Sequence, residues 1–518
     1  MRKLYGKKGS ITVFLALLLT MISSFLFALL ETARVTGLDT RTELVSDMAL
    51  ESVFAEYQQD VYKNYGVLLL DGAYGSSDFQ MQKVEKRLEE MACINLCSSE
   101  NQTREFYQLE ITGCQITKYQ LATDENGDVF RRLAAETARE EAAVQAVESF
   151  ADEIQEKERL EAEHGTVEEY LDAAQKAAEE AAQKAVEEAG QERSGESEQE
   201  EREAVGENEQ KEAETEKNGD TVSNLSGNIE NPIDEAKKWK KRAVLSMVVQ
   251  DEAALSNKAI STENCLLHRQ KQEGNLHTEG KILDELWFLK YLETHMGTFQ
   301  NPKSNRVLDY EMEYVLKGKS SDRENLEGAV KSLIAIREIS NLAFLAKDAG
   351  KQAEAGELAM TLMGWTANPV AISAAKWGIL GAWAYTESIL DVRALLEGRK
   401  ISWMKSSEEW TSGIGEMGAS MEGYAMAKDC VHGWDYMKYL QFLLCFEKDN
   451  KVNYRSMDLI EANTNILERE TIQMDHMIVT CEARMSYETQ PLFWSYVELG
   501  DLGLNGFDFG WNGSYTYL

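Results

Sequence analysis

One short stretch of the sequence brings together side chains that could perform nucleophilic chemistry. His432 lies close to Asp429, Cys430 and Asp435. A thiol activated by a His base, with a carboxylate to orient the imidazole, is an arrangement that covalent catalysis uses. Neighbours in sequence rarely point into one cleft, however, and the 6 His residues of the chain are scattered. We therefore predict no catalytic residues, and we keep a hydrolase built around His432 as the alternative.

Two further patterns match metal sites only in part. Asp124, Asn126 and Asp128 are spaced like the start of a calcium-binding loop, but the Gly at position six and the acid at position twelve of such a loop are missing. A turn at Asn126 explains the pattern better. Cys93 and Cys97 are four residues apart, but no His or second Cys pair lies nearby at zinc spacing. The sequence therefore predicts no metal site and no cofactor, and the thiols are interpreted as free.

The elements that would position any such chemistry begin with an uncharged apolar run from Ile11 to Leu30. A helix rises about 1.5 Å per residue, so the run would span roughly 30 Å, the thickness of a bilayer core. The run is longer than the core of a cleaved signal peptide and lacks a polar face, which argues against a secretory signal and against a buried helix of a soluble protein. Basic residues concentrate before it, which predicts a cytoplasmic N-terminus and an extracellular bulk of the chain: Arg2, Lys3, Lys7 and Lys8.

The residues at the start of this run form a motif. A basic pair, Lys7-Lys8, is followed by Gly9, Ser10 and the apolar helix. This order resembles the N-terminus of tight-adherence (Tad) pilus pseudopilins, and the resemblance implies that a prepilin peptidase would cut between Gly9 and Ser10. Such substrates usually carry Glu at the fifth position after the cut, where this chain has Phe14. A processed helix and an unprocessed anchor therefore both stay open.

Composition excludes one class of partner. The formal net charge is −35, from 54 basic and 89 acidic residues. A chain of this charge will not bind nucleic acid through its overall field. The 518 residues include only 4 Pro, and abundant Ala, Glu and Leu favour helix.

Changes in composition and periodicity predict an α+β fold that is predominantly helical. After the transmembrane helix, a long helical hairpin leads into an acidic linker with almost no large apolar residue, which should be disordered. A helical C-terminal domain then ends in a short β-rich tail of Gly and aromatic residues. The predicted segments are a basic tip with the transmembrane helix (1–34), a juxtamembrane helix with a small α/β head (35–128), exposed helices or a loose coiled coil (129–190), the acidic linker (191–228) and a mainly helical extracytoplasmic domain (229–518).

A second apolar region, residues 358–390, decides how often the chain would cross the membrane. Asn368-Pro369 has the form of an N-cap followed by Pro at the first helical position. Much of the region is Ala and Gly, which suits close helix packing in a core. Charged residues interrupt it or share the helix that follows, which favours core helices and a single-pass protein over a second span: Lys376, Glu387, Asp391 and Arg393.

Short motifs occur along most of the chain outside the acidic insert. They are GSITVF (9–14), EYVLKG (313–318) with Ser321-Asp322, WAYTES (383–388) with DVR (391–393), and Asp435-Tyr436 before Leu440. Together they resemble a family of uncharacterised Gram-positive membrane proteins that is defined as a domain of unknown function. The resemblance implies a cell-envelope protein that acts with Tad-type pilus or secretion components. It defines no catalytic residues.

Two hypotheses from different classes follow. The first is a single-pass, membrane-anchored cell-envelope protein with a structural or assembly role and no enzymatic activity. Its partners would be the lipid bilayer and other envelope or pilus-assembly proteins, and not nucleic acid. The second is an envelope hydrolase or wall-binding module. The hydrolase would need Cys430, His432 and a carboxylate to share one pocket.

Overall fold

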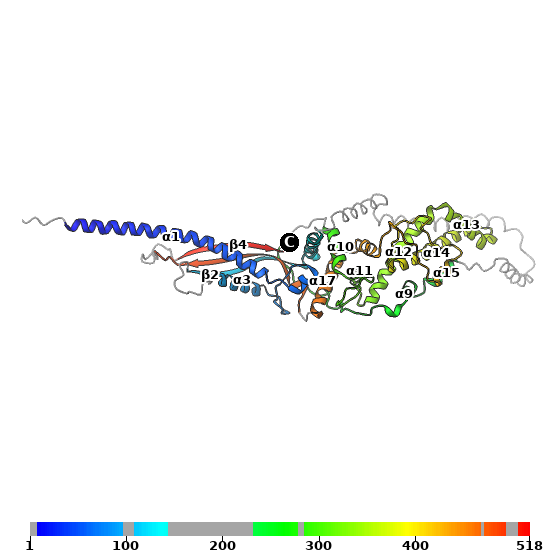
Figure 1. Ribbon diagram of the computed structural model, residues 1–518, viewed down its shortest axis with the longest axis horizontal. Helices are drawn as coiled ribbons and strands as arrows, with labels where there is room; N and C mark the ends of the chain where they lie inside the picture. Colours follow the sequence, from blue (N-terminus) through cyan, green and yellow to red (C-terminus); the bar gives the residue numbers. More distant parts are fainter. Residues whose placement is uncertain (1–7, 97–107, 143–231, 278–283, 468–470, 494–505) are drawn as a thin grey trace, which may run out of the picture. The chain divides into compact units, whose positions relative to one another are not determined.

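The computed structural model describes residues 8–96, 108–142, 232–277, 284–467, 471–493 and 506–518 (Figure 1). The fold is α+β and predominantly helical, as predicted. The chain divides into two compact units, and the first combines residues 1–141, 263–291 and 449–518. The second combines residues 142–262 and 292–448. The predicted coiled coil and acidic linker fall almost entirely on residues 143–231, which lie outside the described residues.

The first unit is organised around α1, a single helix of 47 residues from Lys8 to Phe54. The large apolar side chains between Ile11 and Leu30 are exposed, whereas one face of the helix becomes buried from Glu31 onwards. Figure 1 shows the start of α1 projecting beyond the strands that its later turns cover. One continuous helix therefore has an apolar exposed half and a half that packs in the head.

The sheet that receives α1 is antiparallel and is built from segments far apart in the sequence. Its strands are β1 (Leu70–Asp71), β2 (Leu109–Leu121), β3 (Met477–Thr489) and β4 (Phe507–Thr516). β3 pairs with each of the others, and Cys481 lies opposite Tyr119 of β2 and Tyr515 of β4. Buried and more exposed residues alternate along β3, which is the period of a strand with one face in the core.

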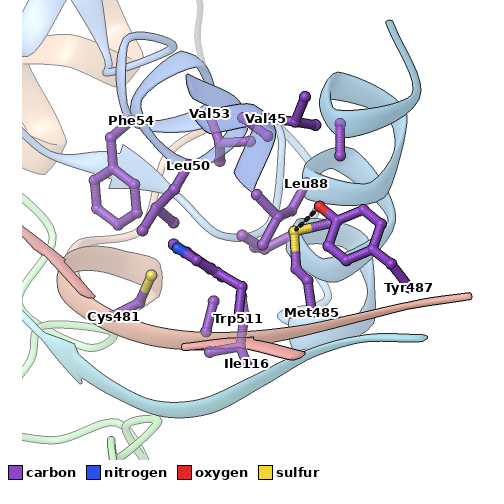
Figure 2. Close-up of a cluster of buried hydrophobic side chains, with 14 of the residues drawn as sticks. Val45, Leu50, Val53, Phe54, Leu88, Ile116, Cys481, Met485, Tyr487 and Trp511 are labelled. Atoms are coloured by element: carbon purple, nitrogen blue, oxygen red, sulfur yellow. Dashed lines mark hydrogen bonds between the residues drawn. The ribbon is translucent and has the colours of Figure 1, made fainter. Parts of the chain in front are cut away.

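The core of this unit lies between the sheet and two helices, α1 and α3 (Met81–Leu96) (Figure 2). Val45, Leu50 and Phe54 of α1 face the sheet, and Leu88 comes from α3. Two polar contacts also join α1 to the strands: Ser46 Oγ lies 2.6 Å from Tyr487 Oη, and Trp511 Nε1 donates to Asp47 Oδ1 at 3.0 Å. The later turns of α1 are thus fixed to the sheet by both apolar and polar contacts.

Shorter elements complete the first unit. They are α2 (Gln59–Tyr65), α4 (Asp124–Ala142), α17 (Asp449–Leu467) and a 3-10 turn, η3 (Met474–His476). The turn predicted at Asn126 is present, because Glu125, Asn126 and Gly127 all have left-handed backbone angles. A Cβ on Gly127 would also lie 2.8 Å from Asn453 Cβ, so this turn needs glycine both for its conformation and for space.

The second unit is helical. Two long helices, α12 (Asp322–Lys347) and α14 (Pro369–Leu396), pack against each other, and α13 (Ala349–Met363) packs on α14. Ser321 caps α12 by accepting from Glu324 N, and the predicted N-cap at Asn368 accepts from Val370 N and Ala371 N. Shorter elements surround them: α8 (Pro232–Trp239), α9 (Val244–Val248), η1 (Glu252–Ala254), α11 (Glu311–Lys317), η2 (Gly364–Thr366), α15 (Met417–Glu422) and α16 (Tyr436–Leu444). Helix α10 (Asp284–His295) carries the chain from the first unit into the second.

The β-rich tail forms strands, but they belong to the first unit. β3 pairs with β1, β2 and β4, whereas the helices of residues 292–448 belong to the second unit. The physical reason is the buried face of β3 and β4, which needs the apolar faces of α1 and α3 as its cover. Residues 229–518, which composition predicts to be one domain, are therefore divided between the two compact units.

Among the described residues, one helix is long and apolar enough to cross a membrane. It is α1, whose most apolar window has a mean hydropathy of 2.6 and is 0% buried. In the region 358–390, α14 instead buries its later turns in the helical core, with Trp383, Ala384 and Leu390 at 0% exposure.

Candidate functional site

Among the described residues, four charged side chains lie together in the interior of the second unit. We call Arg337, Glu387, Asp391 and Lys405 the ion cluster. The first three are 0% exposed and Lys405 is 3% exposed. Burying charge is costly unless the charges are paired and hydrogen-bonded, so the contacts within the cluster determine whether it is stable.

The pairing within the ion cluster is direct. Arg337 Nε donates to Asp391 Oδ2 at 2.9 Å, and Lys405 Nζ lies 2.5 Å from Asp391 Oδ1. Lys405 Nζ also donates to Glu387 Oε1. Two positive and two negative groups therefore neutralise one another within a single buried site.

Neutral groups satisfy much of the remaining hydrogen-bonding capacity. Asn341 Nδ2 donates to Asp391 Oδ2 at 2.9 Å, so this oxygen has two donors. Glu387 accepts from the backbone N–H groups of Thr411 and Ser412 at 3.0 and 2.8 Å. Arg337 Nη1 donates to Ser402 O at 2.9 Å, to Trp403 O at 2.8 Å and to Tyr439 Oη at 2.9 Å.

Helix periodicity explains how the sequence builds the cluster. Arg337 and Asn341 are four residues apart on α12, and Glu387 and Asp391 are four apart on α14, so each pair shares one face of its helix. The two helices pack with these faces together. Lys405 enters from the segment that follows α14.

The segment that carries Lys405 is held in place by a backbone bridge. Ile401 and Trp434 exchange hydrogen bonds of 2.9 Å in both directions. Gly433 permits this approach, because a Cβ there would lie 2.6 to 2.9 Å from backbone atoms of Lys400 and Ile401. Trp383 and Trp410 pack edge to face beside Lys405, with ring centroids 5.6 Å apart. The Lys405 ammonium lies 5.8 Å from the Trp410 centroid.

The electrostatics of the cluster favour its charged form. Burial raises the pKa of Asp391, but the nearby charges of Lys405 and Arg337 act in the opposite direction and leave the pKa below its ordinary value. Burial lowers the pKa of Arg337, and its partners Tyr439 and Asp391 raise the pKa above the ordinary value. Burial raises the pKa of Tyr439 to about 12, so its hydroxyl stays protonated.

A second buried acid in this unit has no cationic partner among the described residues. Glu313 Oε1 accepts from Tyr436 Oη at 2.7 Å and from Phe299 N at 3.0 Å, while Oε2 has no hydrogen-bond partner among the described residues. Burial raises the pKa of Glu313 to about 7. Glu313 and Tyr436 come from two of the motifs noted in the sequence, and the structure joins them by this hydrogen bond.

Arg393, from the DVR motif, ties α14 to two other segments. Its guanidinium donates to the carbonyl oxygens of Met247 at 2.6 Å, Met421 at 2.9 Å and Ala425 at 3.0 Å. Burial lowers its pKa to about 10. This arrangement uses a charged side chain to satisfy buried backbone oxygens, which is a structural role.

In the first unit, a buried ion pair lies where the exposed apolar part of α1 ends. Glu31 and Arg34 are 2% and 1% exposed, and Arg34 Nη1 lies 2.5 Å from Glu31 Oε1. Arg34 Nη2 donates to Thr489 Oγ1 at 2.6 Å, and Glu31 Oε2 accepts from Phe493 N at 2.8 Å. We call these two residues the exit pair. It joins α1 to the end of β3 and to the residues that follow it.

The residues proposed for nucleophilic chemistry do not form a hydrogen-bonded dyad. Cys430 is 3% exposed and its Sγ lies 3.6 Å from Lys428 O, whereas His432 is exposed. Asp429 accepts from Lys400 N, and Asp435 caps α16 by accepting from Lys438 N. Each side chain thus has a separate environment.

The other predicted positions are placed as follows. Gly9 and Ser10 lie in the first turn of α1, which begins at Lys8, and their processing stays a prediction. Asp124 accepts from the backbone N–H groups of Leu121 and Gly274, which suits the turn that follows it. Cys93 is exposed, and Cys97 lies outside the described residues. Within the described ranges, no group of three or more His, Cys, Asp or Glu side chains is arranged to hold a metal ion.

Two members of the ion cluster lie in sequence motifs, but the sequence did not predict that they belong to a cluster. Glu387 and Asp391 fall in motifs and share one helix with four-residue spacing. That spacing in an otherwise apolar stretch was the available signal for two inward-facing acids. Arg337 and Lys405 carry no local signal, because only the packing of α12 and of the segment after α14 brings them to these acids.

These features describe a mostly helical α+β protein with one exposed apolar helix and a buried ion cluster. A comparison with protein families matches residues 222–489, more than half of the 518-residue chain, to the family of unknown function DUF5702. The chain belongs to this family, and the matched residues include all four members of the ion cluster. No curated protein and no solved structure matches the chain.

Proposed function

We propose that the protein is a single-pass, membrane-anchored component of the cell envelope with a structural or assembly role. In this proposal residues 11–30 cross the membrane, the N-terminus is cytoplasmic and both compact units are outside. The observation that carries it is the division of α1 into an exposed apolar half and a half that packs on the sheet. An exposed helix surface of this length and apolarity is suited to lipid and unfavourable in water.

The exit pair supports the same proposal. A membrane helix can hold a folded domain in a fixed position only if the two are joined where the helix leaves the membrane. Glu31 and Arg34 make that connection to Thr489 and Phe493, and the rings of Phe27 and Phe493 lie 6.1 Å apart. A helix held in this way would act as a rigid connection between the bilayer and the sheet.

A pilus- or secretion-linked role is the finer part of the proposal. A long helix that begins in the membrane and continues across an antiparallel sheet is a pilin-like layout, and the Lys7 to Phe14 motif resembles Tad pseudopilins. In a pilus-linked role the mature chain would begin at Ser10, and sequencing the N-terminus of the protein recovered from membranes tests this. A chain that begins at Met1 would leave an unprocessed anchor.

A structural role accounts for the buried polar groups described above. The carbonyl contacts of Arg393 and the hydrogen bonds of Glu313 hold elements of the helical unit together. The alternative, an envelope hydrolase, was motivated by Cys430 and His432, which have separate environments. We therefore favour the assembly role.

Charge substitutions on α1 test the anchor. Leu17 and Leu19 are each 64% exposed and lie within the apolar run, so Leu17→Arg with Leu19→Arg should release much of the full-length protein from membranes. Leu44 and Met48 provide a matched control, because they are 59% and 44% exposed on the same helix beyond the run. Leu44→Arg with Met48→Arg should leave the membrane fraction unchanged. Equal behaviour of the two double variants in carbonate extraction would refute the anchor.

A further inference from the structure

We propose that Lys405 and Asp391 form an intramolecular amide bond, with Glu387 as the proton-transfer group. This inference goes beyond the proposed function and does not depend on it. The amine nitrogen and the acid are already in contact, since Lys405 Nζ lies 2.5 Å from Asp391 Oδ1. Both side chains are buried in the helical unit.

The two oxygens of Asp391 have different environments, which is what acyl transfer requires. Oδ2 receives donors from Arg337 Nε and Asn341 Nδ2, each at 2.9 Å. Oδ1 has no hydrogen bond of favourable geometry among the described residues, although Lys405 Nζ is close to it. Attack of the amine on the carboxyl carbon would place negative charge on Oδ2, where these two donors form a preorganised oxyanion hole.

Glu387 is positioned to move the proton. Its Oε1 accepts from Lys405 Nζ, and its carboxylate is fixed by Ser412 N at 2.8 Å and Ser412 Oγ at 2.7 Å. Glu387 can take one proton from the Lys405 ammonium and deliver it to Asp391 Oδ1. This transfer leaves a neutral amine facing a neutral acid, while Arg337 and Glu387 keep their opposite charges. The formal charge of the cluster does not change.

The condensation balances without a further reactant. The Lys405 nitrogen forms a bond to the Asp391 carboxyl carbon, and the bond from that carbon to Oδ1 breaks. Oδ1 leaves as water with the proton delivered by Glu387 and a second proton from the attacking nitrogen, again through Glu387. No group is oxidised or reduced, and the products are one amide and one water molecule.

The surroundings of the two reacting groups exclude water. The four members of the cluster are at most 3% exposed, and Trp383 and Trp410 pack beside the lysine, so water is scarce where the amide would form. Because both reactants are held in contact, the step is intramolecular, and its activation free energy can be much lower than that of a bimolecular condensation. The bond would link α14 covalently to the segment that carries Lys405 and close a loop between them.

The mass of the purified full-length protein tests the proposal directly. If the bond forms, the intact mass is lower than the sequence mass by one water molecule. Trypsin cuts at Lys376, Arg393, Lys400 and Lys428, so peptide 377–393 should be recovered joined to peptide 401–428, with no cleavage after Lys405. A folded protein with the full sequence mass, or a free peptide that ends at Lys405, would overturn the proposal.

Two variants separate the chemistry from the fold. Glu387→Gln keeps the shape of the side chain but removes its base, so a folded variant should keep the full sequence mass. Lys351→Arg is the matched control, because Lys351 also lies beside Trp383, at 4.4 Å from the ring centroid, but outside the ion cluster. The control should lose one water molecule as the wild type does. Loss of water from a folded Glu387→Gln variant would exclude the role given to Glu387.

Discussion

At the scale of single residues, Glu313 shows how a buried acid links stability to pH. Its pKa is raised by burial from the ordinary 4.5 to about 7, so the folded chain keeps this proton at pH values where the unfolded chain has released it. The group's contribution to stability is therefore complete below about pH 4.5 and is lost as the pH rises to 7. A difference of this size corresponds to roughly 3 kcal/mol.

Glu313→Gln tests this linkage. Glutamine cannot ionise but can still accept from Tyr436 and Phe299, so the variant should be less sensitive to pH and more stable than the wild type at pH 8. Thermal unfolding of the full-length protein in detergent between pH 4 and pH 8 measures the effect. Glu327→Gln is the control, because Glu327 is a partly exposed residue of α12 that pairs with Lys331. Parallel pH profiles for the wild type and Glu313→Gln would contradict the account.

The exit pair makes a second prediction at this scale. Removing one partner leaves the other charge buried, so Glu31→Gln or Arg34→Met should each lower the free energy of unfolding by about 3–5 kcal/mol. The double variant should cost clearly less than the sum of the single variants. Lys86 and Glu90 form a control pair 4.0 Å apart, with side chains 77% and 46% exposed, whose removal should cost below about 1 kcal/mol. Additive losses at Glu31 and Arg34 would show that the two side chains are not coupled.

At the scale of elements, the features predicted from the sequence are those that depend on residues close together in the chain. The apolar run from Ile11 to Leu30 is continuous in the sequence, and the Asn368-Pro369 start of α14 depends on residues within one turn. The turn at Asn126 is of the same kind. These features appear in the structure where the sequence placed them.

Pairings between distant segments were not predictable in the same way. β2 pairs with β3, and Ile116 lies opposite Ala483, although hundreds of residues separate the two strands. The alternation along β3 indicates that one face is buried, but it does not say which helix covers that face. The ion cluster was not predictable for the same reason. Arg337 and Lys405 reach Asp391 only when α12 and the segment after α14 pack on α14.

At the scale of the whole chain, the two compact units are interleaved in the sequence. The chain forms α1 and β2, enters the second unit, returns to the first unit over residues 263–291, and enters the second unit again. It then completes the sheet with β3 and β4. The match to DUF5702 begins at residue 222, after α1, and extends to the end of β3. A role that depends on α1 therefore needs the full-length chain for any test.

The most direct measurement of the central claim is the accessibility of the C-terminus in intact cells. The full-length protein would carry an epitope at its C-terminus, and cells would be treated with protease before and after lysis, followed by carbonate extraction of the membranes. The account predicts that the protein stays in the extracted membrane fraction and that the C-terminal epitope is removed from intact cells. An epitope that is protected until lysis, or a full-length chain in the soluble fraction, would contradict it.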